Sequence, residues 1–87
     1  MAYFEYLWTD DDGGNVQHIA QHGLAPEDFE FVFENCEDEA ISNATGLPIR
    51  FGYTEDGRYI VVIFKWVDDE EILVMPVTAY ETPERRR

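Results

Sequence analysis

The fold is decided by the stretch Ile49-Arg-Phe-Gly-Tyr-Thr-Glu-Asp-Gly-Arg-Tyr-Ile-Val-Val-Ile-Phe-Lys-Trp66, in which two β-prone runs flank the polar segment Thr54-Glu-Asp-Gly57. An Asp-Gly pair between two runs rich in β-branched and aromatic residues is a strong signal for a β-hairpin. The second run is almost unbroken in its apolar character from Tyr59 to Phe64. This pattern predicts a central strand that is flanked on both edges and covered on at least one face.

A further strand is predicted on the C-terminal side of the hairpin. Val67-Asp-Asp-Glu-Glu71 has the composition of a turn, and the apolar pattern resumes from Ile72 to Tyr80. Because proline cannot donate a hydrogen bond to a neighbouring strand, Pro76 predicts an edge position or a bulge in this last strand. The three strands together indicate a β-meander.

The N-terminal half predicts one strand followed by a short helix. The run from Tyr3 to Trp8 is rich in aromatic residues, which suits a strand. Asn15 is the expected N-cap of the helix, because its side chain can accept a hydrogen bond from a free backbone N–H in the first turn. Gly23 is the expected C-terminal stop.

A second helix is predicted to begin at Pro26. Proline is favoured in a first helical turn, and the carboxylates of Glu27 and Asp28 interact favourably with the positive end of the helix dipole. Three apolar residues then recur at helical spacing and form the expected buried face: Phe29, Val32 and Phe33.

The pattern as a whole predicts a single α+β domain over residues 1–87. Two N-terminal helices would pack on one face of an antiparallel sheet of about four strands, in the order βααβββ. The polar segment from Cys36 to Gly46 is expected to be a loop or a weak edge segment. Thr82 and Pro83 could cap and open a short C-terminal helix.

The charge is strongly negative, with 19 acidic residues against six basic ones and a formal net charge of −13. Three of the six cations are Arg85, Arg86 and Arg87, so the rest of the chain is more acidic still. A field of this sign repels nucleic-acid phosphates. It indicates either simple solubility or a basic partner.

Composition also indicates the cellular location of the protein. No apolar run approaches the roughly 20 residues of a membrane span, and the N-terminus lacks the pattern of a signal peptide, so a cytoplasmic location without membrane contact is expected. A single cysteine, Cys36, cannot form an internal disulfide. The last strand, if exposed, could pair across a two-fold axis to form a homodimer.

His18 and His22 are four residues apart, which places both imidazoles on one helix face. Such a pair could hold zinc with help from nearby aspartates, although the sequence between them lacks the glutamate of an HExxH motif. The structural alternative is that His18 packs over the aromatic strand and His22 caps the helix end, and we predict no metal or other cofactor on this basis.

Several motifs in order resemble those of the BrnT-like toxins, which belong to the RelE and ParE superfamily. They are a strand containing Trp8, the helix Asn15-x-x-His-Ile-x-x-His-Gly23, a second helix opened by Pro-Glu-Asp, the hairpin Gly52-Tyr-Thr-x-Asp-Gly-Arg58 followed by Tyr-Ile-Val-Val, and a last strand ending Pro-Val-Thr-Ala79. The resemblance extends from Phe4 to Arg86.

The resemblance implies a component of a type II toxin-antitoxin system. Such a toxin is a metal-independent ribonuclease, blocked by a small cognate antitoxin. In the reaction a ribose 2′-hydroxyl attacks the adjacent phosphate of the RNA, which requires a base, a cation over the phosphate and an acid for the leaving oxygen. The residues that the resemblance indicates for these roles are Arg58, Lys65, Glu84, Arg85 and Arg86.

Two features depart from the family pattern. Tyr80 stands where an arginine usually follows Val-Thr-Ala, and a phenol can donate a hydrogen bond or stack on a base but cannot neutralise a phosphate. Arg50 has a different offset from Gly52 than the corresponding basic residue of the family. With the acidic charge, these departures support an alternative, in which the chain is a catalytically inactive toxin-fold module that sequesters a basic partner protein.

Overall fold

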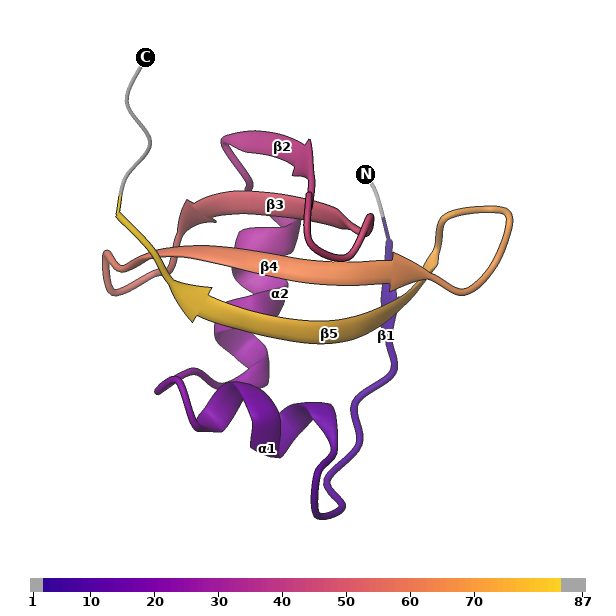
Figure 1. Ribbon diagram of the computed structural model, residues 1–87, viewed down its shortest axis with the longest axis horizontal. Coiled ribbons are helices and arrows are strands. Elements are labelled where there is room, and N and C mark those ends of the chain that lie inside the picture. The colour runs from indigo at the N-terminus through magenta and orange to yellow at the C-terminus, as the bar shows by residue number, and fades with distance from the viewer. Residues whose placement is uncertain (1–2, 84–87) are drawn as a thin grey trace.

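The computed structural model describes residues 3–83 and shows a five-stranded sheet with one helix across a face and the other helix along one edge, so the prediction that both helices pack on one face is met by the second helix alone (Figure 1). In chain order the elements are β1 (Glu5–Tyr6), α1 (Asn15–Ala20), α2 (Pro26–Glu34), β2 (Asp38–Ile41), β3 (Pro48–Tyr53), β4 (Tyr59–Trp66) and β5 (Leu73–Glu81). The strand order across the sheet is β1-β5-β4-β3-β2, with β1 parallel to β5 and all other neighbours antiparallel. The α+β class is confirmed, whereas the expected four-stranded antiparallel sheet is replaced by a mixed sheet of five strands.

The β3–β4 hairpin forms as predicted and fixes the centre of the sheet. Tyr53 lies opposite Tyr59, and the connecting turn closes through a hydrogen bond from Thr54 N to Arg58 O at 2.8 Å. Gly57 has a φ of +90°, which a residue with a side chain adopts only with strain. β4 is flanked by β3 and β5, in agreement with its apolar sequence.

The core lies between this hairpin and α2. Ile60, Val62 and Phe64 alternate along β4, so they point to the same face of the sheet, and all three are buried. The predicted buried face of the second helix is confirmed, since Phe29, Val32 and Phe33 are fully buried against them. The ring centroids of Phe33 and Phe64 are 4.7 Å apart in an edge-to-face arrangement, the geometry that aromatic pairs prefer.

β1 is shorter than expected and runs parallel to β5, with Glu5 opposite Leu73. The aromatic side chains of Tyr6 in β1 and of Trp8 just after it are held by hydrogen bonds to α2. The Tyr6 hydroxyl donates to Glu34 Oε2 at 2.6 Å, and the Trp8 indole donates to Glu30 Oε2 at 2.8 Å. The expectation of a purely antiparallel sheet is wrong here, because strand direction between segments so distant in sequence is set by the path of the chain and not by local composition.

β2 is an edge strand in the segment from Cys36 to Gly46, for which the sequence predicts a loop or a weak edge segment. It pairs with β3, with Glu39 opposite Arg50 and Ile41 opposite Pro48. The acidic composition of this segment disfavours a strand, so the pairing with β3 decides its conformation. The order of elements is therefore βααββββ and not βααβββ.

Asn15 does not act as the predicted N-cap. α1 begins at Asn15 itself, and its amide side chain donates to Leu7 O and Pro76 O, both at 2.9 Å, and accepts from Thr9 N at 2.8 Å. The side chain thus fastens the segment after β1 to β5. The predicted stop at Gly23 is confirmed, since this residue has a φ of +78° in the turn that follows the helix.

Pro76 lies next to a register shift between β4 and β5, so the predicted bulge is confirmed. β5 is not an edge strand along its whole length, because β1 pairs with its first residues. Thr82 and Pro83 are not helical, and the rest of the expected C-terminal helix falls outside the described residues. Within residues 3–83, no helix is both long and apolar enough to span a membrane.

Candidate functional site

Arg58, a predicted catalytic residue, is held in place by all three of its guanidinium nitrogens. Nη1 donates to Gly23 O at 2.8 Å, Nη2 lies 3.3 Å from Asp28 Oδ2, and Nε lies 3.2 Å from Asp56 Oδ2. The hydrogen bond to Asp56 is the largest cause that raises the pKa of Arg58, followed by the negative charges of Asp56 and Asp28. Arg58 therefore joins the β3–β4 turn to the connection between the helices.

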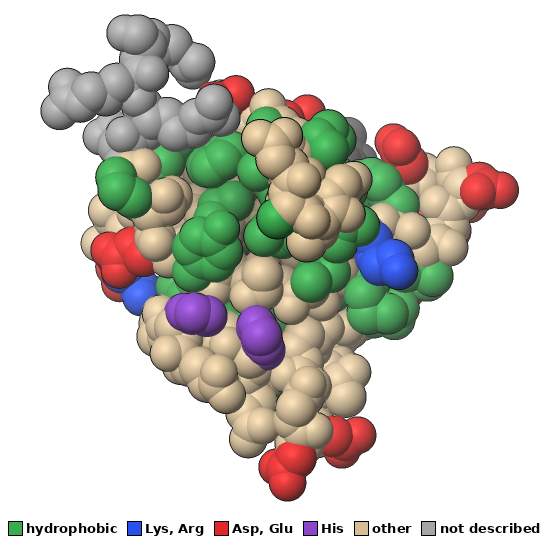
Figure 2. Space-filling model, in the orientation of Figure 1, with side chains coloured by type: hydrophobic (Ala, Val, Ile, Leu, Met, Phe, Trp, Pro, Cys, Tyr) green, Lys and Arg blue, Asp and Glu red, His purple; other side chains and the backbone are tan. Residues whose placement is uncertain are grey.

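Tyr80 lies near the same end of the sheet, opposite Val61 on β4. Its ring centroid is 6.0 Å from that of His22, which in turn is 6.0 Å from that of His18. The prediction that the two histidines share one face is confirmed, and Figure 2 shows them side by side below a hydrophobic surface. The prediction that His18 packs over the aromatic strand is wrong, because the short α1 leaves its side chain exposed.

Lys65 lies at the opposite end of β4. It is seven residues from Arg58, which corresponds to about 23 Å along an extended strand. One phosphate cannot contact both side chains. The structure thus brings Arg58 and Tyr80 to one end of the sheet and separates Lys65 from them, while Glu84, Arg85 and Arg86 lie outside the described residues.

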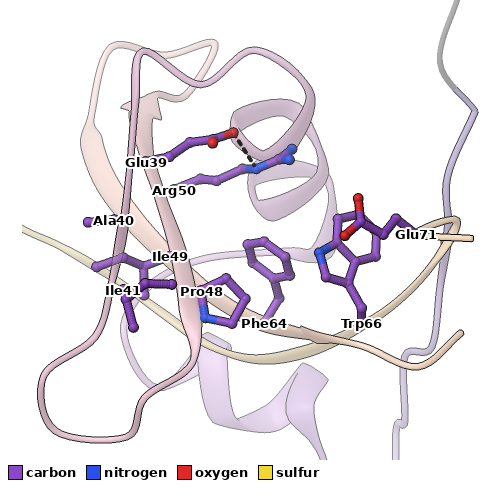
Figure 3. A pocket seen from close by; sticks show the side chains of 9 residues that line it. All are labelled: Glu39, Ala40, Ile41, Pro48, Ile49, Arg50, Phe64, Trp66 and Glu71. Atoms are coloured by element: carbon purple, nitrogen blue, oxygen red, sulfur yellow. Dashed lines mark ion pairs between the residues drawn. The ribbon is translucent and has the colours of Figure 1, made fainter. Parts of the chain in front are cut away.

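A pocket of about 380 Å³ lies at the other end of the sheet, near the start of β3 and the end of β4 (Figure 3). Its lining comes from β2, β3, β4 and the β4–β5 turn, and consists of Glu39, Ala40, Ile41, Pro48, Ile49, Arg50, Phe64, Trp66 and Glu71. The pocket combines a buried aromatic floor, an ion pair and a separate carboxylate.

Arg50 forms one wall of the pocket. Its Nε lies 3.2 Å from Glu39 Oε2, and its Nη1 donates to Phe33 O at 2.9 Å. The guanidinium carbon lies 4.2 Å from the centre of the Phe33 ring and 5.4 Å from that of Phe64, within the range of a cation–π interaction. The charge of Arg50 is thus already balanced by Glu39.

The sequence did not indicate this pocket. From the sequence, Arg50 stands out only by its different offset from the family pattern, and Phe64 and Trp66 only as part of a β-prone run. The alternation of side chains along β3 and β4 is a sequence signal that could have indicated the pocket, because it places Arg50, Phe64 and Trp66 on one face of the sheet. Only the register of the strands shows that Glu39 lies beside Arg50.

Other reactive groups are poorly placed for chemistry. Burial is the main cause that raises the pKa of the Cys36 thiol, which makes it a weak nucleophile at neutral pH. Across residues 3–83, His, Cys, Asp and Glu side chains do not gather in groups of three or more that could hold a metal ion.

The comparisons with known proteins give no match: no family model, no curated protein and no solved structure is significantly similar to the chain. The resemblance to BrnT-like toxins therefore stays a prediction from sequence motifs.

Proposed function

We propose that this protein is a binding module that sequesters a basic partner protein. The proposal rests on one observation, which is that most basic side chains of the described residues are already paired with carboxylates. The described residues contain three basic side chains, and two of these, Arg50 and Arg58, already form ion pairs with carboxylates. A ligand that approaches the domain therefore meets a surface dominated by unneutralised acids.

The distribution of charge supports a protein partner over RNA. Arg85 to Arg87 are half of the six basic residues, so residues 3–83 carry 18 of the 19 acidic side chains against only three basic ones. Figure 2 shows hydrophobic side chains on the face of the sheet opposite α2, with acidic side chains around its periphery. An apolar surface with a charged rim is typical of protein interfaces, and its negative field attracts a basic partner.

A metal-independent ribonuclease neutralised by an antitoxin is the second candidate. The observation that favours it is the proximity of Tyr80 to His22, because an imidazole can transfer protons at neutral pH and a phenol can donate a hydrogen bond. Against it stand the separation of Lys65 and the three contacts that occupy Arg58. In this function too, the protein would bind an antitoxin as its partner.

The experiment starts from a partner captured from the native cells, identified by mass spectrometry and then prepared as a pure protein. We expect a positively charged partner whose affinity for the domain falls as salt rises from about 50 to 200 mM, because screening weakens charge attraction. An acidic partner, or an affinity that salt does not change, would contradict the proposal.

The ribonuclease candidate is tested in parallel by incubating the pure protein with RNA in EDTA. The binding-module proposal expects the RNA to stay intact. Cleavage by the wild type that is lost in both Tyr80→Phe and His22→Gln, with Lys65→Gln as the control, would establish the second candidate in its place.

A further inference from the structure

The outer edge of β2 offers backbone groups for pairing. β2 ends the strand order, and no strand among residues 3–83 pairs with its outer side. In an antiparallel pair only alternate residues direct their N–H and C=O groups to the neighbouring strand, so the others point outward. The N–H of Glu39 donates to Asp38 Oδ1 at 2.9 Å, and an added strand would replace this local hydrogen bond. Ile41, at the end of this strand, is 63% exposed.

The pocket lies directly beside this edge. Three consecutive residues of β2, Glu39 to Ile41, form part of its lining (Figure 3). A strand added to β2 would lie about 4.8 Å away, so a long side chain from it could enter the pocket. Binding of this kind combines backbone hydrogen bonds for affinity with a side-chain pocket for specificity.

The chemistry of the pocket selects the side chain. Phe64 and Trp66 provide an aromatic floor, and Pro48 adds an apolar wall, which together suit a hydrocarbon stem. Glu71 contributes a carboxylate that has no ion pair among those found in residues 3–83. Since Arg50 is neutralised by Glu39, the remaining charge is negative and favours a cationic head group.

A cation in this position would also lie near an aromatic face. The side chains of Phe64 and Trp66 are themselves in edge-to-face contact, with ring centroids 5.4 Å apart. Arginine and lysine gain from contact with indole and phenyl rings, arginine more often than lysine. Anionic side chains would be repelled by Glu71 and by the net charge of the domain.

We propose that β2 is the docking edge for an extended basic segment of the partner protein, and that one arginine or lysine of that segment fills the pocket against Glu71 and Trp66. This inference rests on the proposed function for the sign of the partner's charge. It adds the mode of binding, which is addition of a strand to the sheet, and the residues that read the partner's side chain.

The test uses the full chain and the peptide acetyl-Val-Arg-Val-Arg-Val-amide, followed by ¹H–¹⁵N NMR. We expect shifts concentrated at the amides of β2 and at the indole N–H of Trp66. A peptide with N-methyl groups on alternate residues, or with glutamine in place of arginine, should bind at least about tenfold more weakly, because it loses the backbone bonds or the charge.

Glu71→Gln is the matching protein variant, and Glu70→Gln is its control, since Glu70 belongs to the same exposed turn but does not line the pocket. We expect about a tenfold loss of peptide affinity in Glu71→Gln, as for a charged hydrogen bond, and about twofold or less in Glu70→Gln. Unchanged thermal unfolding of both variants excludes a folding effect.

The outcomes separate the two proposals. Shifts spread over the other acidic turns, equal effects of the two variants, or no binding of the peptide at low salt would each overturn the docking edge. The binding-module function would still stand if the identified partner bound the wild type and Glu71→Gln equally well. That function fails if no basic partner binds in a salt-dependent manner.

Discussion

Replacement of Arg58 distinguishes a structural role from a catalytic one. In Arg58→Gln the guanidinium loses its hydrogen bond to Gly23 O and its ion pairs with Asp28 and Asp56. The side chain of Arg58 is 29% exposed, and those of Asp28 and Asp56 are 23% and 63% exposed, so the two ion pairs are partly screened by water.

The magnitude follows from these contacts. A hydrogen bond from a charged donor to the Gly23 carbonyl contributes about 1.5 kcal/mol, and the partly screened ion pair with Asp28 contributes about 0.5 kcal/mol. We therefore expect Arg58→Gln to lower the free energy of unfolding by about 2 kcal/mol. For a domain of this size that corresponds to a fall in Tm of about 8 to 16 °C.

The assay is thermal unfolding followed by circular dichroism, with Lys65→Gln as the matched control. Lys65 is an exposed cation on β4, the strand that follows Arg58, so its loss should change the free energy of unfolding by less than about 0.5 kcal/mol. A double-mutant cycle with Asp28→Asn should show that the two losses are not additive. If Arg58→Gln unfolds within about 2 °C of the control, the structural role is refuted.

Three further predictions concern the fold. Asn15→Ala removes three side-chain hydrogen bonds, two to the segment after β1 and one to β5, so it should lower the free energy of unfolding by about 2 to 3 kcal/mol. Urea titrations measure this loss, and a loss below about 0.5 kcal/mol would be inconsistent with that role. Gly57→Ala should lower the free energy of unfolding by about 1 kcal/mol, because an added Cβ would meet no other atom but alanine is strained at a φ of +90°. An unchanged Tm would show that the turn changes its backbone conformation to relieve the strain. Hydrogen bonds to Asp68, first from Leu73 N and then from Ile72 N, lower the pKa of its carboxyl; the resulting stabilisation is present above the ordinary pKa and is lost as pH falls through the lowered one. The difference in stability between the wild type and Asp68→Asn should therefore shrink between about pH 5 and pH 2, and a difference that grows on acidification would contradict this sign.

The parts of the fold that were predictable are those that local chemistry decides. The hairpin follows from Asp56-Gly57 between two β-prone runs, because few residues other than glycine adopt the required φ. The start of α2 at Pro26 and its buried face follow from helical spacing. In each case the determining residues lie within a few positions of one another along the chain.

The candidate site could be predicted only in part. Placing Tyr80 near the same end of the sheet as Arg58 required the register between β4 and β5, which the bulge beside Pro76 shifts. The hydrogen bonds of the Arg58 guanidinium to Gly23 and Asp28 depend on a segment some 30 residues earlier in the sequence. Sequence motifs give no measure of whether a cation is available or already paired.

The sequence by itself determined the α+β class, the positions of the helices, the central hairpin and the acidic character of the surface, because propensity, periodicity and charge are local properties. Only the tertiary structure decided that β1 pairs parallel to β5, that β2 is an edge strand, and that Glu39, Arg50, Trp66 and Glu71 enclose a pocket. These features arise from contacts between segments distant in sequence, whose relative placement is fixed by burying one common core.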